Sequence, residues 1–128
     1  MESKLNEGFV KAMAPAGWVA YWPKWLDAEP ATNLYDRLLD DVNWESRTIR
    51  IFGREVLQPR LISFQGEADV HYRYSGGDYL AQAWHPEVQR LQRRLTEWLQ
   101  QRRAELPALP TTAFNSVLIN RYRDGRDS

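Results

Sequence analysis

The chain has 128 residues, 43% of them hydrophobic and 12% aromatic, which indicates a globular domain with a core and excludes a disordered tail. Seventeen lysines and arginines balance seventeen aspartates and glutamates, so any attraction to nucleic acid must come from local charge. With no cysteine, no signal peptide and no apolar run approaching the ~20 residues that cross a bilayer, we expect a cytoplasmic protein without disulfides or thiolate metal sites.

Hydrophobic periodicity divides the chain into a leader and one domain. Residues 1–17 have no sustained period, and we expect a flexible leader there, with at most a short helix. Residues 18–128 contain neither an internal repeat nor a low-complexity linker, which indicates a single domain. Within it, apolar side chains three and four apart predict two amphipathic helices, over residues 29–41 and 86–104, each covering one face of a sheet.

Runs of β-branched and aromatic residues predict strands between the two helices. Residues 48–52 and 60–64, joined by a connection that contains Gly53, are predicted to pair as a hairpin with Phe52 and Gly53 at its tip. Residues 70–74 are predicted to form a short alternating strand that a glycine-containing turn follows. Strands and helices in this order predict the α+β class.

The last apolar run, residues 114–119, predicts a buried strand that ends in two polar side chains. Asn120 and Tyr122 are two apart, so both lie on one face of the strand. An amide and a phenol are neutral groups that can orient a dicarboxylate. The alternative is that both merely satisfy buried strand neighbours.

Four short motifs and a closing sequence occur in a characteristic order. They are residues 51–60, 64–66, 72–76 and 84–86, followed by Asn-Arg-Tyr-x-Asp-Gly at residues 120–125. In these motifs the chain resembles the AlkB-like alkylated-DNA repair dioxygenases, over roughly residues 21–128. The resemblance implies the N-terminal part of a double-stranded β-helix (jelly-roll) dioxygenase fold, with two covering helices, a nucleotide-recognition hairpin and lid, and an incomplete core sheet.

The resemblance also implies two cofactors, 2-oxoglutarate and Fe(II). Asn120 and Tyr122 match the family's Asn-x-Tyr, which holds 2-oxoglutarate, whereas the family's iron-binding His-x-Asp would follow Ser128. We therefore expect an N-terminal portion without catalytic or metal-binding residues of its own, inactive alone. His71 and His85 are the only histidines and have no carboxylate at a ligating spacing, so neither is expected to bind iron.

Alkylated DNA or RNA is the partner that the resemblance implies, with the damaged base taken out of the stack. Tyr72, Tyr74 and Ser75 would belong to the lid that grips this base, and the alternative is a strand whose tyrosines lie partly in the core. No membrane partner is expected.

The predicted hairpin would contact the nucleic acid in two ways. Phe52 and Gly53 would form a wedge between base pairs, and the alternative is that Phe52 folds back onto its own hairpin. Arg60 and the neighbouring arginines are suited to phosphates, unless they form only a solvated face.

The function implied by the resemblance is oxidative removal of N-alkyl groups from adenine and cytosine in alkylation-damage repair, with release of an aldehyde. Two alternatives are a non-catalytic nucleic-acid-binding module that uses Tyr72, Tyr74 and the basic hairpin without iron, and an inactive remnant. Because an incomplete sheet leaves the 114–123 strand with unpaired edges, we predict self-association.

Overall fold

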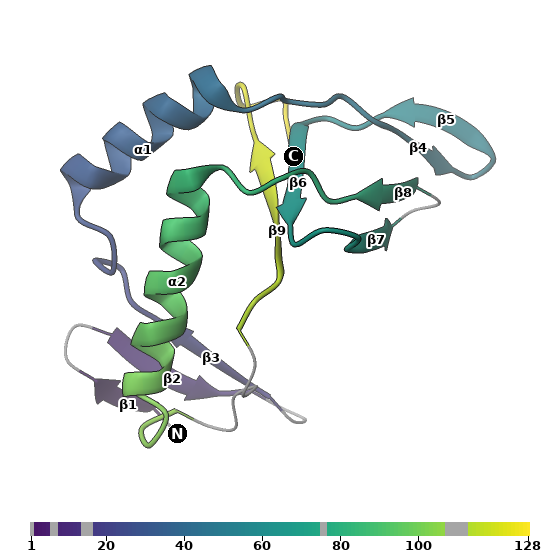
Figure 1. The fold of residues 1–128 in the computed structure, drawn as a ribbon. Coiled ribbons are helices and arrows are strands. Elements are labelled where there is room, and N and C mark those ends of the chain that lie inside the picture. Colours follow the sequence, from purple (N-terminus) through teal and green to yellow (C-terminus); the bar gives the residue numbers. More distant parts are fainter. Residues whose placement is uncertain (1, 6–7, 14–16, 75–76, 107–112) are drawn as a thin grey trace. The chain divides into compact units, whose positions relative to one another are not determined.

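A computed structural model describes residues 2–5, 8–13, 17–74, 77–106 and 113–128, which form two helices and nine strands (Figure 1). This mixture confirms the α+β class. The chain divides into two compact units, residues 1–39 with 91–113 and residues 40–90 with 114–128. Among the described residues, no helix combines the length and apolar character needed to span a bilayer.

The first unit contains a three-stranded antiparallel sheet in the order β1-β2-β3 (Glu2–Leu5, Gly8–Ala12 and Trp18–Tyr21). The sequence predicted no strand before residue 18, and this part of the prediction is wrong. Main-chain pairing defines these strands, for example Phe9 opposite Tyr21. The strands β1 and β2 are too short to show a hydrophobic alternation in the sequence. Flexibility of the leader and a single domain over residues 18–128 stay predictions.

Tryptophans hold the first unit together. Trp22, just after β3, meets Trp98 of α2 (Pro86–Gln101) edge-on, with ring centroids 4.7 Å apart, and Trp25 meets the same ring at 6.3 Å. The guanidinium of Arg94 lies over the Trp25 ring at 4.6 Å. A side chain at Gly8 would collide with the Trp22 ring, so this close approach requires glycine.

Both helices lie close to their predicted positions. The first, α1, spans Ala28–Asp41, and α2 ends at Gln101 and not at residue 104. Pro86 occupies the first position of α2, where a missing N–H has no cost.

Three antiparallel pairs build the second unit: β4 with β5 (Thr48–Ile51 and Arg54–Leu57), β7 with β8 (His71–Tyr74 and Gly77–Leu80), and β6 with β9 (Leu61–Gly66 and Ser116–Arg121). The predicted pairing of residues 48–52 with 60–64 is wrong. A two-residue turn at Phe52 and Gly53 reverses the chain at once, so β4 pairs with residues 54–57. The second apolar run is thereby free to pair with β9.

Strand β6 lies at the centre of this unit. β9 pairs along one edge, as Figure 1 shows, and bridges to Glu45 and Gln82 extend the pairing of β6. Residues 62–66 are all buried, and Ile62 and Phe64 form the core with Tyr79 of β8. Because both faces of β6 are buried, its polar residues Ser63 and Gln65 lie in the interior together with its apolar ones.

Polar side chains on β6 are buried but paired. Gln65 Nε2 donates a hydrogen bond to Ser63 Oγ at 3.1 Å, and Gln65 Oε1 accepts the His85 main-chain N–H at 2.8 Å. Since a buried amide without partners would be destabilising, these bonds let Gln65 occupy the core and connect β6 to the start of α2.

Candidate functional site

The tip of the β4–β5 hairpin presents an aromatic side chain to solvent. Phe52 and Gly53 have φ angles of 50° and 76°, the left-handed values of a type I′ turn, and Phe52 is 101% exposed. Such turns favour Asn, Asp or Gly, and a left-handed residue with a side chain costs about 1–2 kcal/mol. Because the Phe52 side chain is fully exposed, the alternative that it folds back onto its hairpin is wrong.

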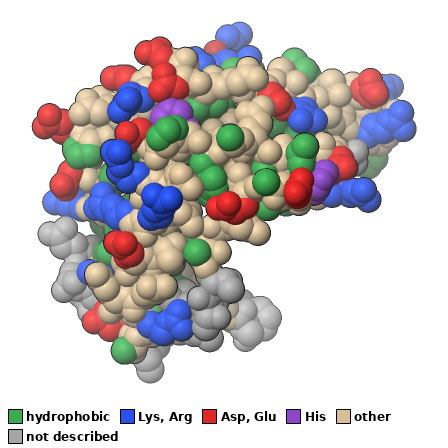
Figure 2. Space-filling view, viewed as in Figure 1, with side chains coloured by type: hydrophobic (Ala, Val, Ile, Leu, Met, Phe, Trp, Pro, Cys, Tyr) green, Lys and Arg blue, Asp and Glu red, His purple; other side chains and the backbone are tan. Residues whose placement is uncertain are grey.

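Charged side chains lie beside this tip. Arg50 and Arg54 are exposed, and Figure 2 shows lysine or arginine side chains at the end of the hairpin. Val56 and Leu57, which lie farther from the tip on β5, are also exposed. The hairpin thus carries an apolar side chain at its tip and two exposed arginines, with the exposed Glu55 opposite Arg50. Contact of these arginines with phosphates stays a prediction.

The β7–β8 hairpin places two tyrosines side by side. Tyr72 and Tyr79 are opposite one another, with ring centroids 6.3 Å apart; Tyr79 is 3% exposed and Tyr72 40% exposed. Tyr72 also lies 5.8 Å from the Phe64 ring, so one part of it packs on the core while another reaches solvent. Tyr74 is the last residue of β7, and Ser75 lies outside the described residues.

Arg47, one of the hairpin arginines that were expected to suit phosphates, lies against this pair, a contact that the sequence did not predict. Arg47 Cζ lies 4.4 Å from the centroid of the Tyr79 ring, and its Nε and Nη2 are each 2.9 Å from Glu45 Oε2. Nothing in the local sequence indicates the contact, because it joins residues from two different hairpins.

Asn120 and Tyr122 lie on one exposed side of the chain at β9, as predicted. Val117 and Ile119 alternate with them and are partly buried, so the prediction of a wholly buried strand is wrong. Only one face of β9 packs on the core of this unit. The assignment of both side chains to 2-oxoglutarate stays a prediction.

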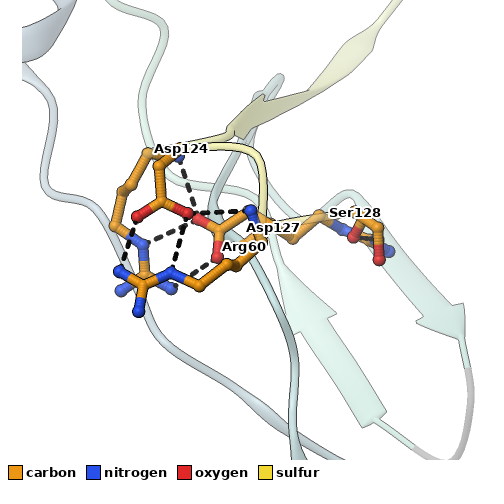
Figure 3. Close-up of polar contacts among 6 residues, drawn as sticks. Arg60, Asp124, Asp127 and Ser128 are labelled. Atoms are coloured by element: carbon orange, nitrogen blue, oxygen red, sulfur yellow. Dashed lines mark hydrogen bonds and ion pairs between the residues drawn. The ribbon is translucent and has the colours of Figure 1, made fainter.

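Two ion pairs organise the turn after β9 (Figure 3). Arg123 pairs with Asp127 and Arg126 with Asp124, each with a nitrogen-to-oxygen distance of 2.8 Å. The hydrogen bond from Arg126 lowers the pKa of the Asp124 carboxyl, and that from Arg123 lowers the pKa of Asp127. The same bonds raise the pKa of each arginine.

The turn should therefore loosen in acid. A carboxyl with a lowered folded pKa stabilises the turn above the unfolded value of about 3.9, and this contribution is lost as pH falls through the folded value. We expect the main-chain amide signals of Arg123 and Arg126, which donate to Asp127 and Asp124, to titrate with midpoints below about pH 3.9 in NMR spectra. Asp127→Asn should abolish the Arg123 titration and retain that of Arg126. Midpoints at the ordinary value would contradict the ion-pair assignment.

Arg60 fastens the same turn to the start of β6 (Figure 3). Its Nη1 donates to the Ser128 carbonyl at 2.7 Å, and the Ser128 N–H donates to the Pro59 carbonyl at 2.9 Å. In the structure, Arg60 thus serves the fold, and its predicted phosphate contact stays a prediction.

His85 caps the N-terminus of α2. Its Nδ1 accepts the Glu87 main-chain N–H at 3.1 Å, so its proton is on Nε2, which is 2.9 Å from Asp41 Oδ2. The other histidine, His71, is exposed and lies 3.5 Å from Asp78. The described residues include no cluster of three His, Cys, Asp or Glu side chains that could hold a metal ion, so they do not fit an iron site.

Removing the cap should destabilise the protein measurably. We expect His85→Ala to lower the free energy of unfolding by about 1 kcal/mol, because Glu87 N–H loses its acceptor. His85→Asn, which retains an acceptor, should recover most of this loss in urea denaturation. His71→Ala is the matched control and should be neutral, since exposed ion pairs contribute little. Equal effects of both alanine substitutions would rule out the capping role.

Comparison with known proteins identifies the family of this chain. The sequence model of the 2OG-Fe(II) oxygenase superfamily matches residues 18–128, and the chain belongs to this superfamily. It is 30% identical to the human alpha-ketoglutarate-dependent dioxygenase alkB homolog 3 over 120 residues, which are 91% of this chain and 37% of that protein. It is 31% identical to the DNA oxidative demethylase ALKBH2 of Arabidopsis thaliana over 108 residues, 84% of this chain and 32% of that protein.

Within the superfamily the chain is AlkB-like. The chain spans about a third of the length of these curated relatives. Enzymes of the superfamily use Fe(II) and 2-oxoglutarate, as its name states.

Proposed function

We propose that this protein is an oxygenase that removes N-alkyl groups from DNA or RNA bases in alkylation-damage repair. Membership of the superfamily and the names of the relatives support the reaction class. When bound, Fe(II) and 2-oxoglutarate would supply the oxidation of the N-alkyl carbon, which then leaves as an aldehyde. The observation that supports nucleic acid as the substrate is the full exposure of Phe52 together with its left-handed φ angle.

Phe52 would insert between base pairs as a wedge. A fully solvated aromatic ring adds no stability to a domain, and the left-handed φ angle of Phe52 costs free energy. Backbone strain that is retained at an exposed site indicates a function. Inserting an apolar side chain between base pairs offsets part of the unstacking cost, which is a few kcal/mol per step. Arg50 and Arg54 beside the tip would attract the phosphates on either side.

The β7–β8 hairpin would receive the extruded base. Tyr72 offers a partly exposed ring, and stacking on such a ring contributes about 1–3 kcal/mol per base. We assign Tyr74 and Ser75 to the same lid, and Arg60 to the phosphates, from the family resemblance.

Asn120 and Tyr122 would orient 2-oxoglutarate. Both side chains are exposed at the C-terminal end of β9, where an amide and a phenol can donate to a carboxylate without adding charge. We further propose that β6 and β9 are strands of the jelly-roll core. Under this proposal, substituting either side chain weakens 2-oxoglutarate binding.

Turnover of a defined lesion tests the proposed function. The intact protein is supplied with Fe(II), 2-oxoglutarate and oxygen, and is mixed with oligonucleotides that carry 1-methyladenine or 3-methylcytosine. We expect loss of the methyl group with matching release of formaldehyde and succinate. Unchanged methylated DNA and RNA would contradict the proposal, and salt-sensitive binding without turnover would favour the non-catalytic module.

A further inference from the structure

One side chain links the two hairpins of the second unit. Arg47 precedes β4, yet its guanidinium lies 4.4 Å from the centroid of the Tyr79 ring in β8. Tyr79 is in turn the cross-strand partner of Tyr72. Arginine, buried tyrosine and partly exposed tyrosine thus form a continuous series from one hairpin to the outer surface of the other.

The guanidinium is fixed in its orientation. Two of its nitrogens contact one oxygen of Glu45, whose other oxygen accepts a hydrogen bond from Gln82 Nε2 at 3.2 Å. The Gln82 main chain donates in turn to the Phe64 carbonyl in β6. Arg47 is therefore connected through Glu45 and Gln82 to the central strand β6. The flat face of its guanidinium remains available to an aromatic ring.

This environment argues against a phosphate contact. The carboxylate of Glu45 neutralises the charge of Arg47, whose side chain is 36% exposed. Arg50, by contrast, is exposed on β4 and available to a phosphate. The two arginines therefore have different roles. Arg50 is available to a phosphate of the nucleic acid, whereas Arg47 supports the pair of tyrosines.

We propose that Arg47 is a positioning residue for base recognition, which holds Tyr79, and through it Tyr72, in the orientation that stacks on an extruded base. The inference rests on the proposed function, because it needs Tyr72 to meet a base. It adds a determinant of base affinity that does not touch the nucleic acid. A lysine at this position would keep the charge and lose the planar stack.

Two single-stranded oligonucleotides test the inference with the intact protein. They are identical except that one carries a central 3-methylcytosine and the other an abasic site, and their affinities are measured by fluorescence anisotropy. The ratio of the two affinities isolates the contribution of the base. We expect Arg47→Lys to lower this ratio by about fivefold or more, because loss of stacking at one base is on this scale. Affinity for the abasic strand and its salt dependence should not change.

Control variants separate the possible results. Arg50→Lys should leave the ratio unchanged, and so should Tyr79→Phe, which keeps the ring beneath the guanidinium. Glu45→Gln, which removes the charged partner of Arg47, should lower the ratio as Arg47→Lys does. Equal losses of affinity for both strands in Arg47→Lys would indicate a phosphate contact and overturn the inference.

Tyr72→Ala distinguishes failure of the inference from failure of the proposed function. If Tyr72→Ala leaves the ratio unchanged, the lid assignment in the proposed function is wrong. If Tyr72→Ala lowers the ratio and Arg47→Lys does not, the lid assignment stands and the positioning role is wrong. In the double variant we expect a loss no larger than that of Tyr72→Ala alone, because Arg47 acts through Tyr72. Additive losses would overturn the inference.

Discussion

Phe52→Asn should make the protein more stable and less active on duplexes. Asparagine tolerates the left-handed φ of 50° at this position, so we expect the free energy of unfolding to rise by about 1 kcal/mol. Under the proposed function, loss of the apolar wedge should lower demethylation of duplex substrates about tenfold, since each 1.4 kcal/mol of lost transition-state stabilisation is about a factor of ten. Urea denaturation and initial rates on matched duplex and single-stranded substrates measure the two effects.

The opposite signs make this prediction specific. Activity on single strands should change little, because no base pair has to be opened. Leu57→Thr is the control, since Leu57 is exposed on the same hairpin but away from its tip. An equal loss on both substrates would falsify the wedge, and a loss of stability would contradict the strain at Phe52.

Gly66→Ala should destabilise the second unit strongly. A Cβ atom at this position would lie 2.5 Å from the Asn115 carbonyl oxygen and 2.9 Å from Ser116 Cα, both of them main-chain atoms that cannot rotate away. Gly66 pairs with Ser116 at the end of the β6–β9 ladder, so relieving the clash requires these strands to separate locally. We expect the free energy of unfolding to fall by about 2–3 kcal/mol, the upper range for overpacking.

A second glycine supplies the control for this substitution. A Cβ at Gly125 would meet no atom within 4 Å, so Gly125→Ala should be neutral or slightly stabilising. Chemical denaturation of both variants measures the difference. If Gly66→Ala unfolds like Gly125→Ala, the close approach of the two strands is wrong. Because Asn120 lies on β9, we also expect weaker 2-oxoglutarate binding by Gly66→Ala under the proposed function.

Local sequence determined the elements that depend on neighbouring residues alone. The 3.6-residue period identified both helices, because an amphipathic helix must place its apolar side chains on one face. Gly53 marked the chain reversal after the strand at residues 48–52, because glycine adopts left-handed φ values readily, although the strand that follows the turn was placed wrongly. The spacing of Asn120 and Tyr122 placed both on one side, because side chains alternate along a strand.

Only the tertiary structure decided which distant segments meet. Pairing of β6 with β9, and not with β4, depends on where the whole chain returns, and the apolar residues of β6 fit either partner. The contact of Arg47 with Tyr79 and that of Arg60 with Ser128 likewise join residues far apart in sequence. Such contacts form because burial and hydrogen bonding are satisfied over the whole unit, and no local pattern of residues encodes them.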